Sequence, residues 1–330
     1  MRETFTSYQS IKRWYDKNYT CYLESIDKLQ SFHEMILKSV FAITLKDMIK
    51  QYGPPPCEFS WFVMGSAGRC EQAVVSDQDH GIIYKEQGTT QITYFLTFGK
   101  KLMQALEYIG FPICDGNVMS SNPIWCRSEK EWEAQINHWI QENSWQSLRY
   151  ILIFMDARVV VGDKKQLATL KKLVYQMIEQ QPSILERLLE NTKFKIDAIG
   201  IVNQFLPITT GPYSGCINIK LTALFPYVNA IRLLAIIEKI EATSTLSRIE
   251  ALGLYDQYKV MMETHIDNFK KLMQMRISKK EITHYEDTHY LNIKSLTKLE
   301  KKKLKQIFKD LKVLQKYTKL RVQEVVSNEK

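Results

Sequence analysis

Apolar positions along the chain follow two periodicities, and the change between them separates the expected elements. Over the first fifty residues apolar side chains recur at helical spacing, which predicts helix over about residues 8–51. Gly53 and the three prolines after it end that helix. Two short apolar runs follow, Trp61–Met64 and Gly81–Tyr84, and each is typical of a buried strand.

Helical periodicity then returns. Residues 92–108 form one predicted helix, with Gly110 at its C-terminal end. Ser128 with Glu131 three residues later has the capping-box pattern of a further helix. Tryptophans recur every seven residues in this region, a spacing that favours a place in the core: Trp125, Trp132 and Trp139.

From about Ser144 onward the sequence shows no convincing strand. Residues 279–292 form a polar linker and 209–215 an internal loop. The remaining segments suit helices, namely residues 146–160, 164–180, 184–205, 218–240, 255–277 and 296–325. The pattern therefore predicts three parts: an N-terminal helical segment (1–52), a core with a sheet (53–143), and a helical C-terminal domain (144–330).

Composition agrees with a globular chain. The 330 residues are 45% hydrophobic and 25% charged, and they suffice for two domains. We find no apolar run of bilayer-spanning length and no signal peptide at the N-terminus. The six cysteines are scattered, with no C-x-x-C pair, which argues against a zinc ribbon and fits a reducing compartment. We therefore expect a cytoplasmic protein.

The net charge of +9 is concentrated at one end. Residues 294–330 hold twelve Lys or Arg against four Asp or Glu, so they carry nearly all of it. A nucleic-acid-binding protein more often spreads basic residues over a broad groove. Apolar residues on one face of the last helix favour an ordinary packed helix with a solvated basic face. Binding of an acidic protein, a nucleic acid or a membrane surface through that face stays an alternative.

The candidate chemistry lies between the two predicted strands. Gly65-Ser66 ends the first strand, and Asp77 and Asp79 precede the second. Residues i and i+2 of an extended chain point to the same side, so the two carboxylates would lie together and could share a divalent metal. Gly65 would allow close approach of a phosphate to the backbone, and Ser66 could donate its hydroxyl. This layout suits a nucleoside triphosphate and two metal ions.

Other readings of these residues stay open. Taken alone, Asp77 and Asp79 could lie on a solvated strand, Ser66 could cap a helix, and Arg69 could pair with Glu71 at the surface. If a helix begins at Gly65, its amides would face the phosphates and Arg69, about one turn in, could reach a phosphate oxygen. His80 alternates to the opposite face, which favours a structural role.

The motifs Gly65-Ser66-Ala67-Gly68-Arg69-Cys70-Glu71-Gln72 and Ser76-Asp77-Gln78-Asp79 resemble the polymerase-beta-type nucleotidyltransferase superfamily. More closely, they are similar to bacterial nucleotidyltransferases of domain of unknown function 294, which are related to the PII-uridylyltransferase. Later blocks support the resemblance: Gly110–Cys114, Val118–Trp125, Phe154–Asp163, and Ile219-Lys220 with the helices that follow.

The resemblance implies an α+β fold in which a small mixed sheet flanked by helices precedes an all-helical, substrate-binding C-terminal domain. It implies that Asp77 and Asp79 are catalytic and bind metal, and that Gly65 and Ser66 bind the nucleotide. We expect Arg69 and Lys220 to assist, although a surface position is the ordinary alternative for a helix lysine such as Lys220.

The superfamily's third acidic position has no clear occupant. The extended segment Val118–Asn122 is in the right place but offers Asn122, with Asp115 nearby. Asp156 is a second candidate, although we expect residues 154–161 to be helical, and an ion pair with Arg158 would explain it equally well.

The leading hypothesis is a bacterial signalling enzyme that uses Mg²⁺ or Mn²⁺ to transfer a nucleoside monophosphate from ATP or UTP. The acceptor would be a hydroxyl of a small molecule or of a protein, such as a regulatory protein. Two alternatives remain, a non-catalytic nucleotide-sensing module on the same fold and a nucleic-acid binder that uses the basic tail. Metal-capable residues at 284–289 lie in the predicted linker and are not favoured as a site.

Overall fold

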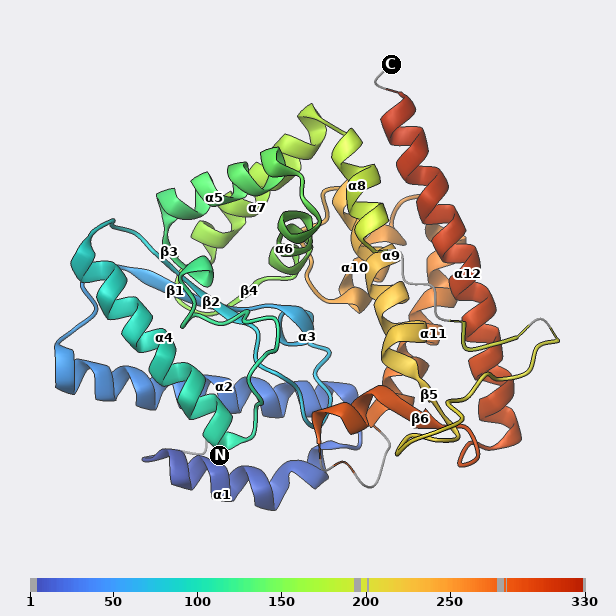
Figure 1. Ribbon diagram of the computed structural model, residues 1–330, viewed down its shortest axis with the longest axis horizontal. Coiled ribbons are helices and arrows are strands. Elements are labelled where there is room, and N and C mark those ends of the chain that lie inside the picture. The colour runs from blue at the N-terminus through green and yellow to red at the C-terminus, as the bar shows by residue number, and fades with distance from the viewer. Residues whose placement is uncertain (1–4, 193–196, 201, 278–281, 283, 329–330) are drawn as a thin grey trace. The chain divides into compact units, whose positions relative to one another are not determined.

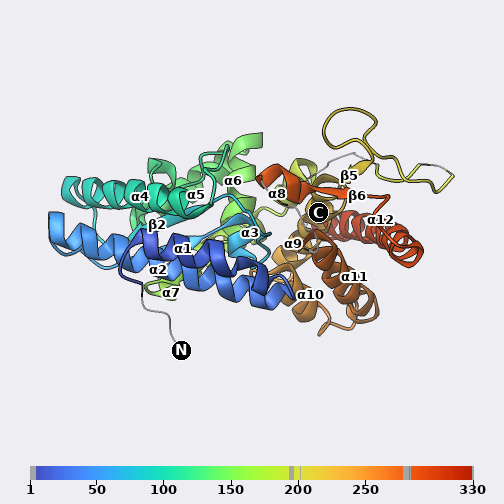
Figure 2. The same ribbon diagram turned by 90° about the horizontal axis from the view of Figure 1, so that it is seen from below.

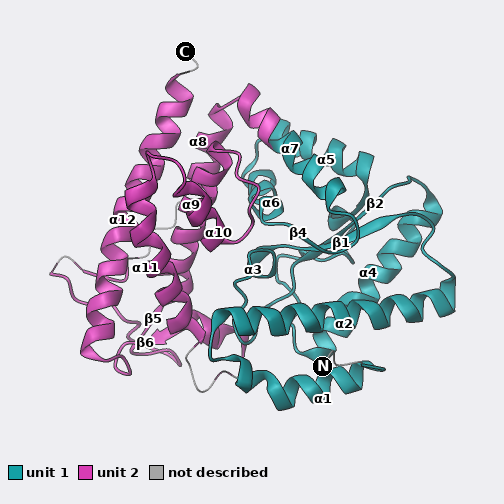
Figure 3. Ribbon diagram, turned by 180° about the vertical axis from the view of Figure 1, so that it is seen from behind, with its two compact units in different colours: residues 1–174 teal, residues 175–330 magenta. Residues whose placement is uncertain are grey.

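The computed structural model describes residues 5–192, 197–200, 202–277, 282 and 284–328. The chain forms two compact units, residues 1–174 and 175–330, which Figure 3 distinguishes by colour. Each unit is described by itself. The division into three parts that the sequence predicts, with a boundary after residue 143, stays a prediction.

The first unit is built on a four-stranded mixed sheet. Its strands are β1 (Phe59–Val63), β2 (His80–Tyr84), β3 (Cys126–Ser128) and β4 (Arg158–Val161), in the order β3-β2-β1-β4. β1 is antiparallel to both β2 and β4, whereas β2 and β3 are parallel. The two strands predicted on either side of the Gly-Ser and Asp motifs are therefore confirmed, and they are neighbours at the centre of the sheet.

Helices cover both faces of this sheet (Figure 1). One side carries α1, α2 and α4, and the other carries α5, α6 and α7. The bounds are α1 (Tyr8–Asn18), α2 (Ile26–Tyr52), α4 (Thr89–Ile109), α5 (Glu129–Glu142), α6 (Trp145–Met155) and α7 (Lys164–Gln180), with single turns at η1 (Tyr19–Tyr22), α3 (Gly65–Gly68) and η2 (Pro123–Trp125).

Strand alternation explains how both helical layers are held. Trp61 packs its ring against Phe41 of α2 at 5.3 Å between centroids. The next residue, Phe62, points the other way and meets Trp132 of α5 at 5.8 Å. Because successive side chains of a strand leave on opposite faces, two adjacent aromatic residues of β1 anchor one layer each.

The second unit is mainly helical, as predicted, with a two-stranded antiparallel sheet of β5 (Cys216–Asn218) and β6 (Tyr290–Asn292). Its central helix α9 (Phe225–Ile237) is almost entirely buried, and α12 packs against α8, α9 and α11 (Figures 1 and 2). The other bounds are α8 (Ser183–Asn191), α10 (Thr245–Leu252), α11 (Lys259–Ile277), α12 (Lys298–Ser327), the π-helical turn η3 (Lys220–Leu224) and the 3₁₀ turn η4 (Tyr285–His289).

Among the described residues, one stretch is apolar and long enough to cross a membrane by length and composition alone. It is Lys220–Ile237, with a mean hydropathy of 1.4, whereas the sequence predicts no run of that length. The stretch is 72% buried inside the protein. Its burial is that of a core helix.

Several local predictions are confirmed. Ser128 and Glu131 form the expected reciprocal capping box at the start of α5. The three regularly spaced tryptophans are all buried. In α12 the predicted apolar face is buried, and it comprises Leu304, Ile307, Phe308, Leu311 and Leu314.

Other predictions are wrong in detail. The N-terminal helix is broken by η1, and strands occur after Ser144. Residues 154–161 are not one helix, because α6 ends at Met155 and β4 begins at Arg158. Val159, Val160 and Val161 are β-branched and favour the strand. The helix predicted over 184–205 ends at Asn191, and residues 193–196 and 201 of that range lie outside the described residues.

The predicted linker at 279–292 also contains structure. Its second half holds η4 and β6, whereas residues 279–281 and 283 lie outside the described part of the chain.

Burial of His265 predicts acid sensitivity of the fold. His265 of α11 is 2% exposed and lies 2.6 Å from the hydroxyl of Tyr227. Burial lowers the pKa of His265 from 6.5 to about 4, against the opposing effect of Asp310. In the unfolded chain His265 becomes protonated below about pH 6.5, whereas in the folded chain it becomes protonated only below about pH 4. Stability is therefore lost as pH falls through this window, by about 2 kcal/mol at pH 5 for this one group.

We expect His265→Gln to remove that share of the pH dependence. Urea unfolding at pH 8 and pH 5 measures it, with His138→Gln, at an exposed histidine, as the control. The wild type and the control should lose about 2 kcal/mol more than His265→Gln between the two pH values. Equal losses in all three proteins would show that His265 is not a source of the acid sensitivity.

Candidate metal and nucleotide site

Two aspartates stand side by side just before β2. The chain at residues 77–80 is extended, and its side chains alternate. Gln78 and His80 are buried, at 4% and 1% exposure, whereas Asp77 and Asp79 are half-buried. The carboxylates therefore share the more accessible side, as the sequence predicts.

The inward side chains hold the neighbouring loop in place. A ring nitrogen of His80, Nε2, lies 2.9 Å from Oε1 of Gln78, and the other, Nδ1, lies 2.9 Å from Oγ of Ser120. The Gln78 amide in turn donates to the carbonyl of Phe111 at 3.1 Å. Burial lowers the pKa of His80 to about 3, so the ring is neutral near pH 7. His80 thus has the structural role expected for it.

This anchoring brings Cys114 to the aspartates. Gln78 and Ile113 form a parallel bridge, and the backbone N–H of Gln78 donates to the carbonyl of Pro112 at 3.1 Å. Three possible ligand atoms lie within 4.8 Å of one another: a carboxylate oxygen of Asp77, a carboxylate oxygen of Asp79 and the Sγ of Cys114. In the described part of the chain, no other group of three His, Cys, Asp or Glu side chains meets in this way.

The thiol responds to its surroundings. Burial raises the pKa of Cys114 well above its usual value, and the nearby carboxylates of Asp79 and Asp77 raise it further. The thiol is therefore protonated at neutral pH when no cation is present.

The Gly-Ser turn closes over the same carboxylates. Gly65 has φ +53°, and a Cβ at this position would lie 2.0 Å from Oδ2 of Asp79. Only glycine leaves room for the carboxylate here. The amide of Met64 donates to the Asp79 carbonyl at 2.8 Å, which joins the end of β1 to the aspartates. Two carboxylates and a sulfur beside an open backbone turn are a donor set that fits a divalent cation.

The turn is shorter than predicted. α3 spans Gly65–Gly68, a single turn, and Arg69 caps its C-terminal end instead of lying within a longer helix. Ser66 is half-buried in this turn. Any contact with a phosphate would rest on Ser66 and the close backbone at Gly65 and not on the end of a long helix.

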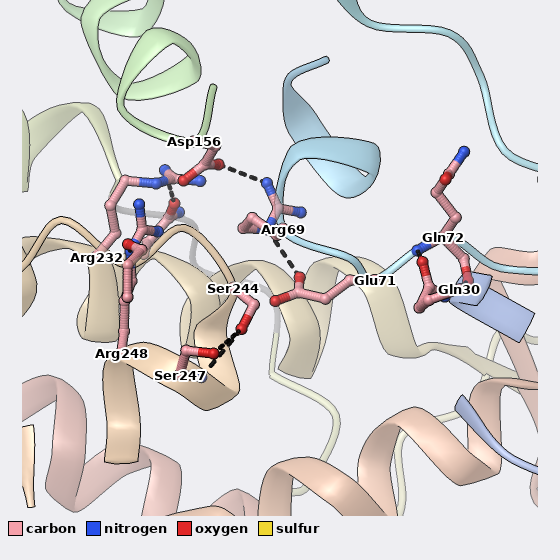
Figure 4. Close-up of polar contacts among 11 residues, drawn as sticks. Gln30, Arg69, Glu71, Gln72, Asp156, Arg232, Ser244, Ser247 and Arg248 are labelled. Atoms are coloured by element: carbon pink, nitrogen blue, oxygen red, sulfur yellow. Dashed lines mark hydrogen bonds and ion pairs between the residues drawn. The ribbon is translucent and has the colours of Figure 1, made fainter. Parts of the chain in front are cut away.

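Arg69 lies in a buried ion-pair cluster (Figure 4). Its Nε lies 2.7 Å from Oε2 of Glu71, and its Nη1 lies 2.6 Å from Oδ2 of Asp156. The residue is 7% exposed. Burial by itself would lower the pKa of Arg69, but the two carboxylates raise it above its ordinary value, so the charge is firmly retained.

Asp156 thus forms an ion pair, but with Arg69 and not with the expected Arg158. Arg158 instead contacts Glu34 at 2.8 Å. The proposed phosphate contact of Arg69 and the proposed third-ligand role of Asp156 remain predictions. The pairs link the loop after α3 to the end of α6.

The other candidates have local contacts of their own. Asn122 caps η2, because its Oδ1 accepts the amide of Ile124 at 3.0 Å. Lys220 belongs to the second unit, where its Nζ donates to the Tyr285 hydroxyl and lies 2.9 Å from Nε2 of His289. The predicted site roles of both residues stay predictions.

Sequence reasoning missed Cys114 as a site residue. It was noted only within the block Gly110–Cys114 that supports the resemblance. The one available signal was the position of that block directly after the helix that follows the second strand, where the chain returns to the sheet.

A mixed sheet that presents two aspartates beside a Gly-Ser turn is the arrangement of a nucleotidyltransferase-type domain. Family comparison agrees. The model described as "Putative nucleotidyltransferase DUF294" matches residues 20–146, and "Putative nucleotidyltransferase substrate binding domain" matches residues 182–322. These matches span most of the chain, which belongs to this nucleotidyltransferase family. A comparison with curated proteins found no match.

The buried cluster at Arg69 predicts a large loss of stability on substitution. Arg69→Met would leave two carboxylates buried without this partner, which costs about 3–5 kcal/mol. Lys85→Met, which removes an exposed pair with Glu58, should cost less than about 1 kcal/mol. Urea unfolding followed by circular dichroism measures both. Similar stabilities of the two variants would contradict the structural importance of the cluster.

Proposed function

We propose that this protein transfers a nucleoside monophosphate from ATP or UTP to a hydroxyl of a protein or small molecule, with Mg²⁺ or Mn²⁺ as cofactor. The observation that carries the proposal is the convergence of Asp77 and Asp79 beneath the Gly65 turn, within the region matched by the nucleotidyltransferase family. In this reaction the acceptor hydroxyl loses its proton to solvent and its oxygen bonds to the α-phosphorus. The bond between that phosphorus and the oxygen that bridges to the β-phosphate breaks, and pyrophosphate leaves.

Each residue would have a defined task. Asp77 and Asp79 would hold the cation, which when bound neutralises phosphate charge and favours loss of pyrophosphate. Gly65 would allow the triphosphate to approach the backbone, and Ser66 would donate its hydroxyl. Arg69 would support the turn through Glu71 and Asp156 and add positive charge near the phosphates.

The second unit would present the acceptor. Residues 182–322 match the family's substrate-binding domain, and this range includes Lys220. Lys220 would supply a positive charge for a phosphate or an acidic group of the substrate. An acceptor that is itself a regulatory protein would make this a bacterial signalling enzyme like the PII-uridylyltransferase, working in the cytoplasm.

One observation favours a second candidate function. The third side chain near the aspartates is a thiol and not a carboxylate. A domain that binds nucleotide without turnover, as a sensor, would tolerate that replacement.

Nucleic-acid binding through α12 is less favoured. The basic face of α12 supplies charge for nucleic acid, but its apolar face is occupied by packing within the unit, which is the ordinary role of such a helix.

We expect Asp77→Ala and Asp79→Ala to abolish transfer. Purified protein is incubated with α-labelled ATP or UTP, candidate acceptors and Mg²⁺ or Mn²⁺, and both pyrophosphate release and labelled product are measured. Loss of an outer-shell residue of a metal site costs 10- to 100-fold, so loss of a direct ligand should exceed about 100-fold. Asp115→Ala is the matched control, because Asp115 is exposed in the same loop as Cys114 and lies outside the ligand group.

Three outcomes separate the hypotheses. Transfer that survives in the Asp77→Ala, Asp79→Ala double variant would refute the site. Calorimetric binding of nucleotide with no pyrophosphate released for any acceptor would favour the sensor. Absence of nucleotide binding would reject both.

A further inference from the structure

The candidate cation site includes a sulfur atom that the family resemblance does not imply. Asp77, Asp79 and Cys114 bring two carboxylates and a thiol within 4.8 Å. The residues predicted as an oxygen ligand at the third position make other contacts. Asp156 pairs with Arg69, and Asn122 caps η2. Asp115 is next to Cys114 in the chain but is exposed and not part of the group.

Cys114 is held in this place by the fold. The bridge between Gln78 and Ile113 fixes the backbone one residue before it. The side-chain amide of Gln78 also donates to the Phe111 carbonyl, and the His80 ring hydrogen-bonds to the Ser120 hydroxyl. Both ends of the loop 111–120 are therefore held against residues 77–80. A cation between the aspartates would therefore meet a sulfur that is already positioned.

We infer that Cys114 is a direct metal ligand and sets the cation specificity of the site. The inference rests on the proposed function, because it concerns the same cation. Carboxylate oxygens suit Mg²⁺ and Mn²⁺, whereas thiolate favours softer cations such as Co²⁺, Zn²⁺ and Cd²⁺. A mixed set of two oxygens and one sulfur strengthens binding of thiophilic cations far more than binding of Mg²⁺. On coordination the thiol proton passes to solvent and a metal–sulfur bond replaces it.

The test uses Co²⁺ as a spectroscopic probe of sulfur ligation. The full-length reduced protein is titrated with Co²⁺, and the near-ultraviolet sulfur-to-cobalt charge-transfer band is recorded. The wild type and Cys21→Ser, at an exposed cysteine, should both show the band. Cys114→Ser should lose it and should bind Co²⁺ at least about tenfold more weakly, while Mg²⁺ affinity, measured by competition, changes less than about threefold.

A second variant, Cys114→Asp, distinguishes loss of the sulfur ligand from misfolding of Cys114→Ser. Cys114→Asp supplies a third carboxylate, and it should lose the band while gaining Mg²⁺ affinity relative to Co²⁺ by at least about tenfold. A charge-transfer band that persists in both Cys114 variants, or that is absent from the wild type, would overturn the inference. So would an unchanged preference between Co²⁺ and Mg²⁺ in Cys114→Asp.

Failure of the inference and failure of the proposed function give different results. If the band is absent but transfer still requires Asp77 and Asp79, the function stands and Cys114 is not a ligand. If the band depends on Cys114 but no nucleotide binds and none is transferred, the metal site stands and the proposed function fails.

Discussion

Alternation of side chains over residues 77–80 is the constraint on which the rest of the site depends. Because an extended chain sends successive side chains to opposite sides, burying Gln78 and His80 turns Asp77 and Asp79 outward together. A slip of one residue would exchange the two sets and bury both carboxylates. Burying an unpaired charge is far more costly than burying a neutral imidazole with hydrogen-bond partners. The pairing of Val63 with His80 therefore fixes the chemistry as well as the sheet.

A second constraint holds the turn opposite the aspartates. Arg69, at the end of α3, bonds to Glu71 and to Asp156, which is 87 residues away in the chain. Buried ion pairs contribute little net stability against apolar replacements, but they penalise any arrangement that separates the partners. Asp156 is fully buried and follows α6 directly. The pair thus ties the position of the turn to the junction between α6 and β4. Gly68 reinforces this closeness, because a Cβ there would lie 2.1 Å from the Asp156 carbonyl.

The sequence predicts those parts of this arrangement that local patterns determine. β1 and β2 are compact apolar runs with turn residues beside them, and the capping box of α5 lies within four residues, so each is visible in a short window. The sequence pattern does not predict β4, because α6 and β4 are both apolar and only two residues separate them, so the two elements look like one helical segment. β5 and β6 have three residues each, too few to show any alternation.

The candidate site likewise has features that local sequence predicts and features that depend on contacts between distant residues. The pairing of Asp77 with Asp79 follows from a spacing of two, and the need for glycine at position 65 follows from the turn. The proximity of Cys114 depends instead on a bridge between residues 35 positions apart, and the partners of Arg69 and Asp156 depend on how α6 meets the sheet. No local pattern records such contacts, which is why the sequence offers Asn122 and Asp156 for the third position.

A thiol in that position also has an electrostatic rationale. Two like charges about 5 Å apart repel by about 3 kcal/mol at an effective dielectric constant of 20. A third carboxylate would add a similar repulsion to each of the first two whenever the cation is absent. The Cys114 thiol is neutral under those conditions, because its surroundings raise its pKa, so it does not repel Asp79 as a carboxylate would. It becomes an anion only when a cation takes the place of its proton. The loop can therefore pack closely against the aspartates without the metal, and the third negative charge develops only together with the positive charge that balances it.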